Sequence, residues 1–386
     1  MRIIPVSSLE PGNVVGKPLL DSKGTTLLNA GVKLTEGYIK SLQSKGYTYL
    51  YVSDTESGID VEPEESLDPV VRAKALSAMD ELVKTIEKEF ASLRSSSFED
   101  VRSFCSSDRM RVLFTQGPVW KAMMSCISSI LEEVLTRSTL AGLTSIKSED
   151  SALYEHSIDV CVVAVMLGRH IGMTAQRLKQ LASGCLLHDI GKVFLDKQSG
   201  DRESVRLHTL LGYELLKNND DPDILAPHVA YEHHEHQDGS GKPRGLVGSN
   251  TIERDRNLST PVPTLIGEIA AVANTYDNLL NGIGAPRPLA PDQALRTVSD
   301  YAGTRLNREL VTAFLRIAPV YPLGTEVVVD GGKYDRYVGI VTEVRQSSLD
   351  KPVIALYRDP AGKLILPVEL DMKAVEDVLL RGKPLF

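Results

Sequence analysis

The six residues from Leu187 to Lys192 combine more potential chemistry than any other short run in this sequence. They read Leu-His-Asp-Ile-Gly-Lys, so His188 and Asp189 offer an imidazole and a carboxylate, two groups that bind metal ions. Lys192 follows His188 by one helical turn, where its ammonium could meet a phosphate oxygen, and Gly191 closes the turn.

Neighbouring side chains on a helix diverge by about 100 degrees, so this pair reaches one metal only near a helix end. Two metals that share Asp189 as a bridge would use the pair directly. A hydrogen bond between His188 and Asp189 at a helix terminus is the alternative when the pair is considered alone.

The distribution of histidines favours a metal site. All eight histidines lie between His156 and His236, and neither end of the chain contains one. An imidazole without a partner is costly to bury, and His156 lies in an apolar helical pattern. Together with His208, His233 and His234 on other helices, these residues suit a borderline metal such as iron or manganese in a pocket between helices.

The segments that must position these residues are mainly helical. From residue 149 to 320 the apolar periodicity predicts an all-α bundle. The predicted helices span residues 152–171, 175–188, 208–216, 225–235, 265–280, 291–301 and 308–317, with loops at 196–201, 219–223 and 237–260.

Two smaller units flank the bundle. The N-terminal residues predict an α/β unit with a short strand at 25–28, a helix capped by Thr35 and a strand at 47–52. An acidic linker and a connector with helices at 70–93 and 120–137 follow. The last segment predicts an antiparallel β unit with strands at 325–329, 337–344, 353–357 and 364–368. The expected fold class is therefore mainly α, with domains at 1–53, 54–69, 70–148, 149–320 and 321–386.

Composition excludes several classes of function. With 42% hydrophobic and 24% charged residues among 386, the chain is globular, and its net charge of −8 argues against a general nucleic-acid partner. The sequence has no run of about 18 apolar residues, and Met1–Pro5 has no signal-peptide core, so we expect a cytoplasmic protein with no membrane partner. The cysteines are scattered, which predicts reduced thiols at Cys105, Cys126, Cys161 and Cys185.

Six motifs in the central region occur in a diagnostic order. They are Tyr154–Ser157, Leu187–Lys192, His208 with Gly212–Leu216, His233–Glu235 followed by Asp238–Gly241, Ala273–Asp277, and Tyr301–Thr304. Together they resemble an HD-GYP domain, the branch of the HD phosphohydrolase superfamily that hydrolyses cyclic di-GMP. The flanking units also resemble segments found beside this domain in some members, with lower specificity.

The resemblance implies a set of site residues. Two divalent cations, iron or manganese, would be held by His156, His188, Asp189, His208, His233, His234 and Asn274. The catalytic residues would be His188, Asp189 and Lys192, with Asp189 bridging and Lys192 near the scissile phosphate. Cyclic di-GMP would be bound by Lys192, Asp238, Gly239, Gly241, Lys242 and Arg287, and hydrolysed by an activated water to pGpG or GMP.

Three other histidines, Glu235 and a partner protein are expected to have roles other than metal binding. His170, His228 and His236 match no ligand position of the family, which favours surface or hydrogen-bonding roles. Glu235 is expected to orient a ligand histidine. A homodimer or a signalling partner protein is compatible with the flanking units.

The chain departs from the family pattern at four places. Asn274 stands where members usually carry an aspartate ligand, and its neutral oxygen should hold a cation more weakly. Ala152, one turn before His156, cannot supply the carboxylate that some members use for a third metal. Lys242 replaces the tyrosine of Gly-Tyr-Pro, and Gly282–Pro286 replaces an arginine-rich run, part of whose charge Arg287 could supply.

Two hypotheses follow from these departures. The first is an active metal-dependent cyclic di-GMP phosphodiesterase. The second is a degenerate HD-GYP protein that binds a nucleotide or a partner protein with little or no catalysis. An HD phosphohydrolase for another phosphate ester is a third option, because a metal site does not itself select the base.

Overall fold

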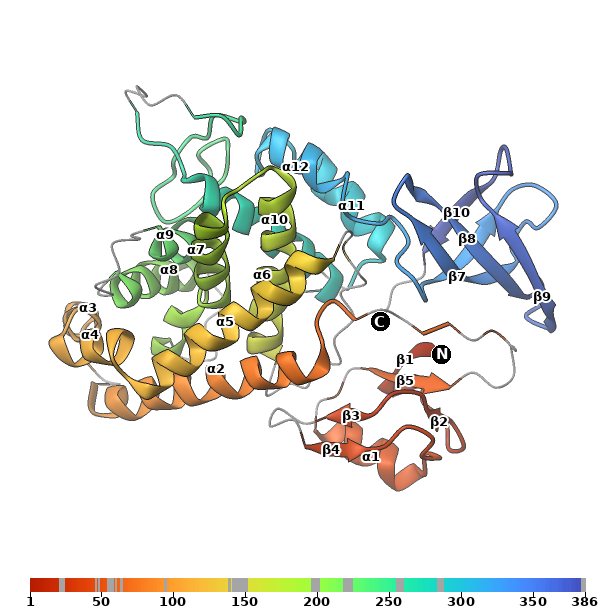
Figure 1. The fold of residues 1–386 in the computed structure, drawn as a ribbon, viewed down its shortest axis with the longest axis horizontal. Coiled ribbons are helices and arrows are strands. Elements are labelled where there is room, and N and C mark those ends of the chain that lie inside the picture. Colours follow the sequence, from red (N-terminus) through yellow and green to blue (C-terminus); the bar gives the residue numbers. More distant parts are fainter. Residues whose placement is uncertain are drawn as a thin grey trace.

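The computed structural model describes residues 1–20, 25–45, 47, 49–53, 59, 61–62, 65–93, 96–137, 140, 152–195, 202–217, 225–254, 260–282 and 288–382. Within these residues the chain forms a helical bundle, a small α/β unit near the N-terminus and an antiparallel β unit near the C-terminus (Figure 1). The predicted mainly α fold class, with its two flanking units, is confirmed.

Three helices of the bundle begin at residues whose side chains satisfy free backbone N–H groups. Thr264 caps α10 (Leu265–Asn281) by accepting from Gly267 N, and Gly282 ends this helix at a φ of 70°. Thr174 caps α7 (Ala175–Leu186) and Asn307 caps α12 (Arg308–Phe314). The other elements of the bundle are α6 (Ala152–His170), η3 (Ile190–Phe194), α8 (Arg202–Leu216), α9 (Ala226–Glu232) and α11 (Pro291–Asp300).

The centre of the bundle is α6. Its residues from 160 to 167 are all buried, which is typical of a helix that neighbours cover on every side. It packs against α7 and α10, while α9 packs against α7, α8 and α10. These contacts bring together the segments that carry the histidines.

Two helices of the connector lie along one side of the bundle (Figure 1). They are α2 (Pro69–Phe90), followed by η2 (Ala91–Leu93), and α5 (Pro118–Thr136), and their buried apolar faces pack together. Asp68 caps α2 by accepting hydrogen bonds from Val70 N and Val71 N. Both helices were predicted from their periodicity.

Two short helices between them were not predicted. They are α3 (Phe98–Cys105) and α4 (Asp108–Thr115), with N-caps at Ser97 and Ser107. Each spans eight residues and buries only two side chains, four positions apart, so the apolar periodicity is too short to recognise. The capping box formed by Ser97 and Asp100 was the available signal.

The N-terminal unit is a small α/β fold. A three-stranded antiparallel sheet has the order β1-β5-β2, and β3 pairs with β4. The helix α1 (Glu36–Ser44) is capped by Thr35, as predicted. The strands are β1 (Arg2–Pro5), followed by η1 (Val6–Ser8), then β2 (Val14–Val15), β3 (Leu19–Leu20), β4 (Thr26–Leu28) and β5 (Tyr49–Ser53).

The C-terminal unit is a five-stranded antiparallel sheet with the order β10-β6-β7-β8-β9. Its strands are β6 (Glu326–Asp330), β7 (Val338–Arg345), β8 (Ser348–Arg358), β9 (Leu364–Asp371) and β10 (Leu379–Gly382). The four predicted strands are confirmed, and β10 is an addition. The last strand is tied to the start of the unit by the Tyr321 hydroxyl, which donates to Leu380 O at 2.6 Å.

The linker makes specific contacts in its described part. Val61 is buried against Ile340 of β7 and Ala355 of β8. The amino group of Met1 donates a hydrogen bond to Val61 O at 2.9 Å. Residues near position 61 therefore contact both flanking units.

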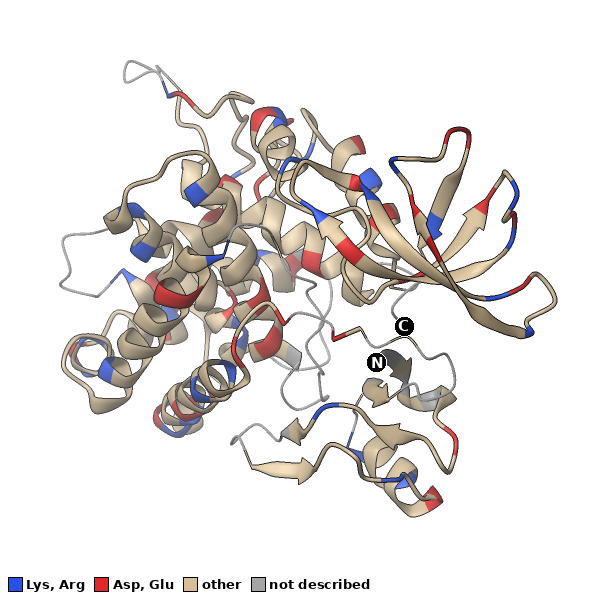
Figure 2. Cartoon of the chain, turned by 45° about the vertical axis from the view of Figure 1, so that its right-hand side comes forward, with Lys and Arg blue, Asp and Glu red and all other residues tan. Residues whose placement is uncertain are grey.

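The charged residues are mixed over the molecule. Figure 2 shows Lys and Arg interspersed with Asp and Glu along the helices and the β unit.

Among the described residues, no helix has both the length and the apolar character required to cross a membrane. The predicted reduced state of the four cysteines is confirmed, because all of them are free thiols.

Candidate metal centre

Asp189 lies at the centre of the histidine cluster. Its Oδ2 atom is 3.4 Å from His188 Nε2 and 3.9 Å from His156 Nε2. Its Oδ1 atom is 3.4 Å from His208 Nε2 and 3.7 Å from His233 Nε2. The two carboxylate oxygens therefore face different pairs of imidazoles, as a carboxylate shared between two cations would.

The cluster divides into two groups of possible ligands. One group contains His156, His188 and Asp189, and the other contains His208, His233 and His234. In each group the candidate ligand atoms lie within 4.8 Å of one another. Three nitrogen or oxygen donors at this spacing are typical of a site for a divalent transition metal. All six residues were predicted from the sequence, and the fold brings them together.

Adjacent residues can share a site here because both pairs lie at helix ends. The helix α7 ends at Leu186 and η3 begins at Ile190, so His188 and Asp189 occupy the turn between them. In the same way α9 ends at Glu232, before His233 and His234. The predicted helices 175–188 and 225–235 were too long at this end, because apolar periodicity does not mark the last turn.

Backbone carbonyls fix the tautomers of three histidines. The Nδ1 atom lies 2.7 Å from Cys185 O in His188, 3.0 Å from Ser204 O in His208, and 3.0 Å from Val229 O in His233. A carbonyl oxygen only accepts, so each Nδ1 carries the proton and donates it. The lone pair on each Nε2 is then available to a cation, as in most protein metal sites.

His156 obtains the same orientation from a carboxylate. Its Nδ1 atom lies 2.6 Å from Asp277 Oδ2, and Asp277 of α10 is fully buried. Asp277 ends the motif 273–277, and no role for it was predicted. Its position one turn after Asn274 was the available signal.

The protonation states suit metal binding. Burial lowers the pKa of His188 to about 4 and that of His234 to about 3. Burial also lowers the pKa of His208 and of His233, so the imidazoles are neutral. Burial alone would raise the pKa of Asp189, but its neighbours, the Lys192 ammonium among them, hold it well below its ordinary value, so its carboxylate is charged.

Two buried polar atoms at the centre make no hydrogen bond with the described residues. They are His188 Nε2 and Asp189 Oδ1, which both face the interior of the cluster. A buried acceptor without a partner costs stability, and a cation would satisfy both. Neutral imidazoles, a charged carboxylate and these two atoms together fit a divalent metal.

Lys192 is the cation that approaches the cluster. Its Nζ atom is 2.5 Å from Asp189 Oδ2, and its side chain is 42% exposed. The ammonium therefore neutralises the central carboxylate while it keeps contact with solvent.

Gly191 allows η3 to approach α8 closely. A Cβ atom at this position would lie 2.0 Å from His208 O and 2.7 Å from Gly212 N. Its backbone is not left-handed, so the glycine is required by this approach rather than by the turn expected from the sequence. The contact sets the distance between His208 on α8 and Asp189 just before η3.

The glycine-rich loop after α9 is folded against the cluster. The carboxylate of Asp238 accepts a hydrogen bond from Ser240 N at 2.9 Å, and Lys242 N donates to His234 O at 2.9 Å. A Cβ atom at Gly241 would lie 2.5 Å from His234 O, so only glycine fits there. Gly239 adopts a left-handed φ of 79°.

Buried glutamates hold this loop in place. Glu235 accepts backbone hydrogen bonds from Arg244 N at 2.6 Å and from Leu246 N at 2.8 Å. Its described contacts therefore fix the loop, and its expected role in orienting a ligand histidine stays a prediction. Glu268 accepts from Gln237 Nε2 and Asn307 Nδ2, each at 2.8 Å, and links the loop to α10 and α12.

The other residues predicted from the sequence are Asn274, Arg287 and the three histidines outside the cluster. Asn274 is buried on α10, and its amide oxygen accepts a hydrogen bond from Asn278 Nδ2 at 3.0 Å. Its role as a ligand stays a prediction.

Arg287 and residues 283–286 lie outside the described residues. As expected, His228 and His236 make hydrogen bonds, to Glu232 and Ser240, while His170 is exposed.

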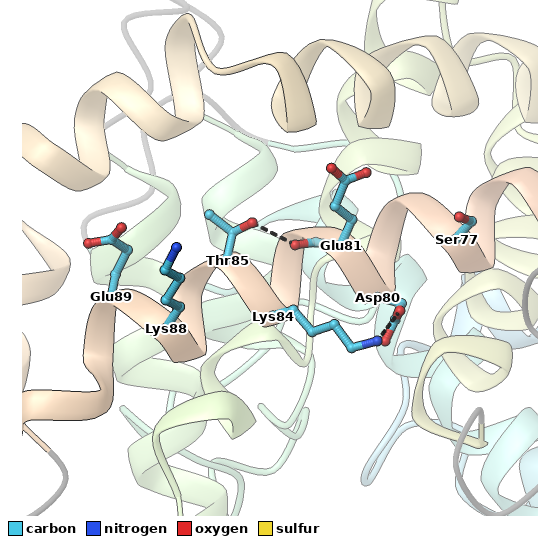
Figure 3. Close-up of a pocket in the computed structure, with 7 residues that line it drawn as sticks. All are labelled: Ser77, Asp80, Glu81, Lys84, Thr85, Lys88 and Glu89. Carbon is cyan, nitrogen blue, oxygen red and sulfur yellow. Dashed lines mark hydrogen bonds and ion pairs between the residues drawn. The ribbon is translucent and has the colours of Figure 1, made fainter.

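A surface groove of about 530 Å³ runs along α2, apart from the cluster (Figure 3). Charged side chains of α2 line it, and Lys84 pairs with Asp80 at 2.7 Å. Glu89 pairs with Arg109. No cluster residue lines this groove.

We expect the metal-free protein to lose stability as the pH falls from 6.5 towards 4. Burial lowers the pKa of His188 from its ordinary 6.5 to about 4, so the unfolded chain binds a proton in this range that the folded chain does not. His234 acts in the same direction. Each such imidazole lowers the free energy of unfolding by up to about 1.4 kcal/mol per pH unit.

Urea unfolding of chelator-treated protein across this range measures the effect. His188→Gln removes one titrating group and should flatten the dependence. Asp189 does not contribute in this window, because its pKa lies well below 3.8 and its stabilising charge is lost only at lower pH. A pH-independent free energy of unfolding between 6.5 and 4 would contradict neutral, buried imidazoles.

Comparison with known proteins agrees with this geometry. Residues 153–279 match the family model of the HD domain. A cyclic di-GMP phosphodiesterase of Pseudomonas aeruginosa is 25% identical over 337 residues, which cover 82% of this chain and 75% of that protein.

Two further relatives are shorter matches. A cyclic di-GMP phosphodiesterase of Thermotoga maritima is 27% identical over 178 residues, 44% of this chain and 45% of the relative. The cyclic di-GMP phosphodiesterase response regulator RpfG of Xanthomonas campestris pv. campestris is 27% identical over 262 residues, 64% of this chain and 65% of the relative. Residues 153–279 therefore form an HD domain, and the chain is similar to these three cyclic di-GMP phosphodiesterases.

Proposed function

We propose that the protein is a metal-dependent phosphodiesterase that hydrolyses cyclic di-GMP to pGpG or GMP. The observation that carries the proposal is the position of Asp189, whose two oxygens face separate pairs of histidines. A family that acts on phosphate esters and relatives named for cyclic di-GMP support the choice of substrate.

The residues of the cluster have separate tasks in this proposal. His156 and His188 would hold one cation and His208, His233 and His234 the other, with Asp189 shared between them. Two divalent cations, iron or manganese, would lower the pKa of a water and stabilise charge on the phosphoryl oxygens.

The chain's own groups prepare the site. The carbonyls of Cys185, Ser204 and Val229, together with Asp277, keep the proton on Nδ1 of four histidines, which aims the Nε2 lone pair inward. These are His188, His208, His233 and His156. The ammonium of Lys192 is half-exposed and can turn from Asp189 to a phosphate oxygen of the substrate.

The glycine-rich loop would bind the rest of the substrate. It follows His234 directly, and its backbone is held by Glu235 and Glu268. Lys242 would add a positive charge for a phosphate where the family usually places an aromatic ring. Gly239, with its left-handed φ, and Gly241, which has no space for a side chain, would set the shape of the loop that meets the substrate.

One observation favours the second candidate, a family member that binds a nucleotide or a partner protein with little catalysis. Asn274 carries no charge, and its oxygen is already bonded to Asn278. A cation held by Asn274 in place of the family's aspartate would then have one anionic ligand fewer than usual in the family.

Metal content and hydrolysis of cyclic di-GMP by the wild type and by Asn274→Asp test both candidates. We expect manganese uptake and formation of pGpG or GMP by the wild type, and a severalfold gain in manganese affinity in the variant, because a carboxylate binds a hard cation more strongly than an amide. His188→Ala should lose both properties. Metal-free turnover that is equal in the wild type and His188→Ala would refute the phosphodiesterase proposal, and metal binding without turnover would favour the second candidate.

A further inference from the structure

Arg72 is a buried cation outside the metal cluster. It lies in the first turns of α2, and only 8% of its surface is exposed. Its guanidinium donates to Glu155 Oε2 at 2.7 Å and to Asp159 Oδ1 at 2.8 Å. It also donates to Ser66 Oγ at 2.9 Å. The planar fork of an arginine can hold two carboxylates at once, which an ammonium cannot do with the same geometry.

The two carboxylates belong to the helix that carries His156. Glu155 and Asp159 are four residues apart on α6, so they share one face, and both are buried. His156 follows Glu155 and points about 100 degrees away around the helix, towards Asp189 and Asp277. Any rotation or axial slip of α6 that breaks the contacts to Arg72 also moves the imidazole of His156.

We propose that Arg72 is a positioning residue for the metal centre, because it fixes the rotation and height of α6 and thereby the place of His156 Nε2 beside Asp189. The inference rests on the proposed metal site and adds a residue that lies outside it. His156 is the cluster residue that α6 carries, and its Nε2 atom lies 3.9 Å from Asp189 Oδ2. A helical step is about 1.5 Å along the axis, so a slip of a fraction of a residue is enough to spoil this distance.

The same residue connects the linker to the cluster. Ser66, which accepts from Arg72, is buried in the segment that precedes α2. The carbonyl of the neighbouring Glu65 accepts from Arg137 Nη1 of the connector at 2.6 Å. Further along the linker, Val61 packs against the C-terminal β unit. Arg72 therefore lies between Ser66 of the linker and the helix that carries His156.

If Arg72 only stabilised the fold, its loss would lower stability without a specific effect on His156. Removing a buried guanidinium leaves two carboxylates without their cation, which destabilises the whole protein whatever its function. The test must therefore separate global stability from the geometry at His156. Leu82→Ala is the matched control, because Leu82 lies on the same helix, is fully buried and takes part in the apolar core.

Manganese binding to the full chain, measured by isothermal titration calorimetry together with the melting temperature, provides the first readout. We expect Arg72→Met to lower manganese affinity by about 10- to 100-fold, the range seen when the support of a metal ligand is removed. Arg72→Lys should recover part of the loss, and Asp159→Asn should show a smaller loss. Leu82→Ala should lower the melting temperature and keep the wild-type affinity.

The position of His156 in metal-free crystal structures provides the second readout. We expect the distance from His156 Nε2 to Asp189 Oδ2 to change in Arg72→Met and to remain as in the wild type in Leu82→Ala. If Arg72→Met does not fold, Arg72→Lys and Asp159→Asn carry both measurements. Wild-type affinity and an unmoved His156 in the Arg72 variants would overturn the inference. If the wild type binds no manganese, the proposed function fails, and the metal-free structures still decide the role of Arg72.

Discussion

Asp189→Asn is expected to remove metal binding from both halves of the cluster and to leave the fold intact. The Asp189 carboxylate faces both sets of histidines, and asparagine keeps its shape without its charge. We therefore expect a fall in manganese affinity larger than the roughly 10- to 100-fold that follows loss of a residue merely supporting a ligand. Turnover of cyclic di-GMP should disappear with the metal.

Stability should distinguish this effect from unfolding. In the metal-free protein, the lost pairing with Lys192 is offset because a charged group no longer has to be buried. A cation that binds only the folded state raises the melting temperature of the wild type, and this rise should be absent in Asp189→Asn. His170→Gln, an exposed histidine at the end of α6, is the control. A manganese-dependent rise in the melting temperature of Asp189→Asn would contradict the central role of this carboxylate.

Lys192→Met is expected to separate metal binding from catalysis. The ammonium contacts Asp189 Oδ2, so it would compete with a cation for that oxygen. Its removal should raise manganese affinity severalfold. Turnover should nevertheless fall by roughly 10²- to 10³-fold, the loss typical of removing one group that stabilises transition-state charge.

Calorimetry with manganese and steady-state kinetics with cyclic di-GMP measure the two effects on one sample. Lys192→Arg keeps the charge and should retain part of the activity. Lys217→Met is the control, because Lys217 pairs with Glu214 on α8 rather than with the cluster. A parallel loss of metal affinity and turnover in Lys192→Met would place Lys192 in metal binding instead of substrate binding.

The candidate ligands could be predicted because their types and order are local properties of the sequence. His188, Asp189 and the His233–His234 pair lie in short motifs, and apolar periodicity placed the helices that carry them. The residues at which α7 and α9 end were harder to predict from the sequence. These ends decide whether two adjacent residues can face one cation, and they depend on tertiary contacts rather than on periodicity.

The supporting residues could not be predicted because their partners are far away in the chain. Asp277 contacts His156 across 121 positions, and Arg72 contacts Glu155 across 83. Before the fold is known, an arginine in an amphipathic helix is most simply a surface residue. The requirement for Gly191 has the same origin, because the atoms that exclude a side chain there belong to His208 and Gly212 of α8.

The distribution of the cluster along the chain also affects how the protein folds. Its candidate ligands come from α6, the turn after α7, helix α8 and the end of α9, so a bound ion would join segments that are remote in the unfolded chain. A cation would therefore act as a reversible cross-link that closes loops, and part of its binding free energy would become folding free energy. Metal supply during synthesis would then control how much folded protein accumulates, before it controls the rate of any reaction.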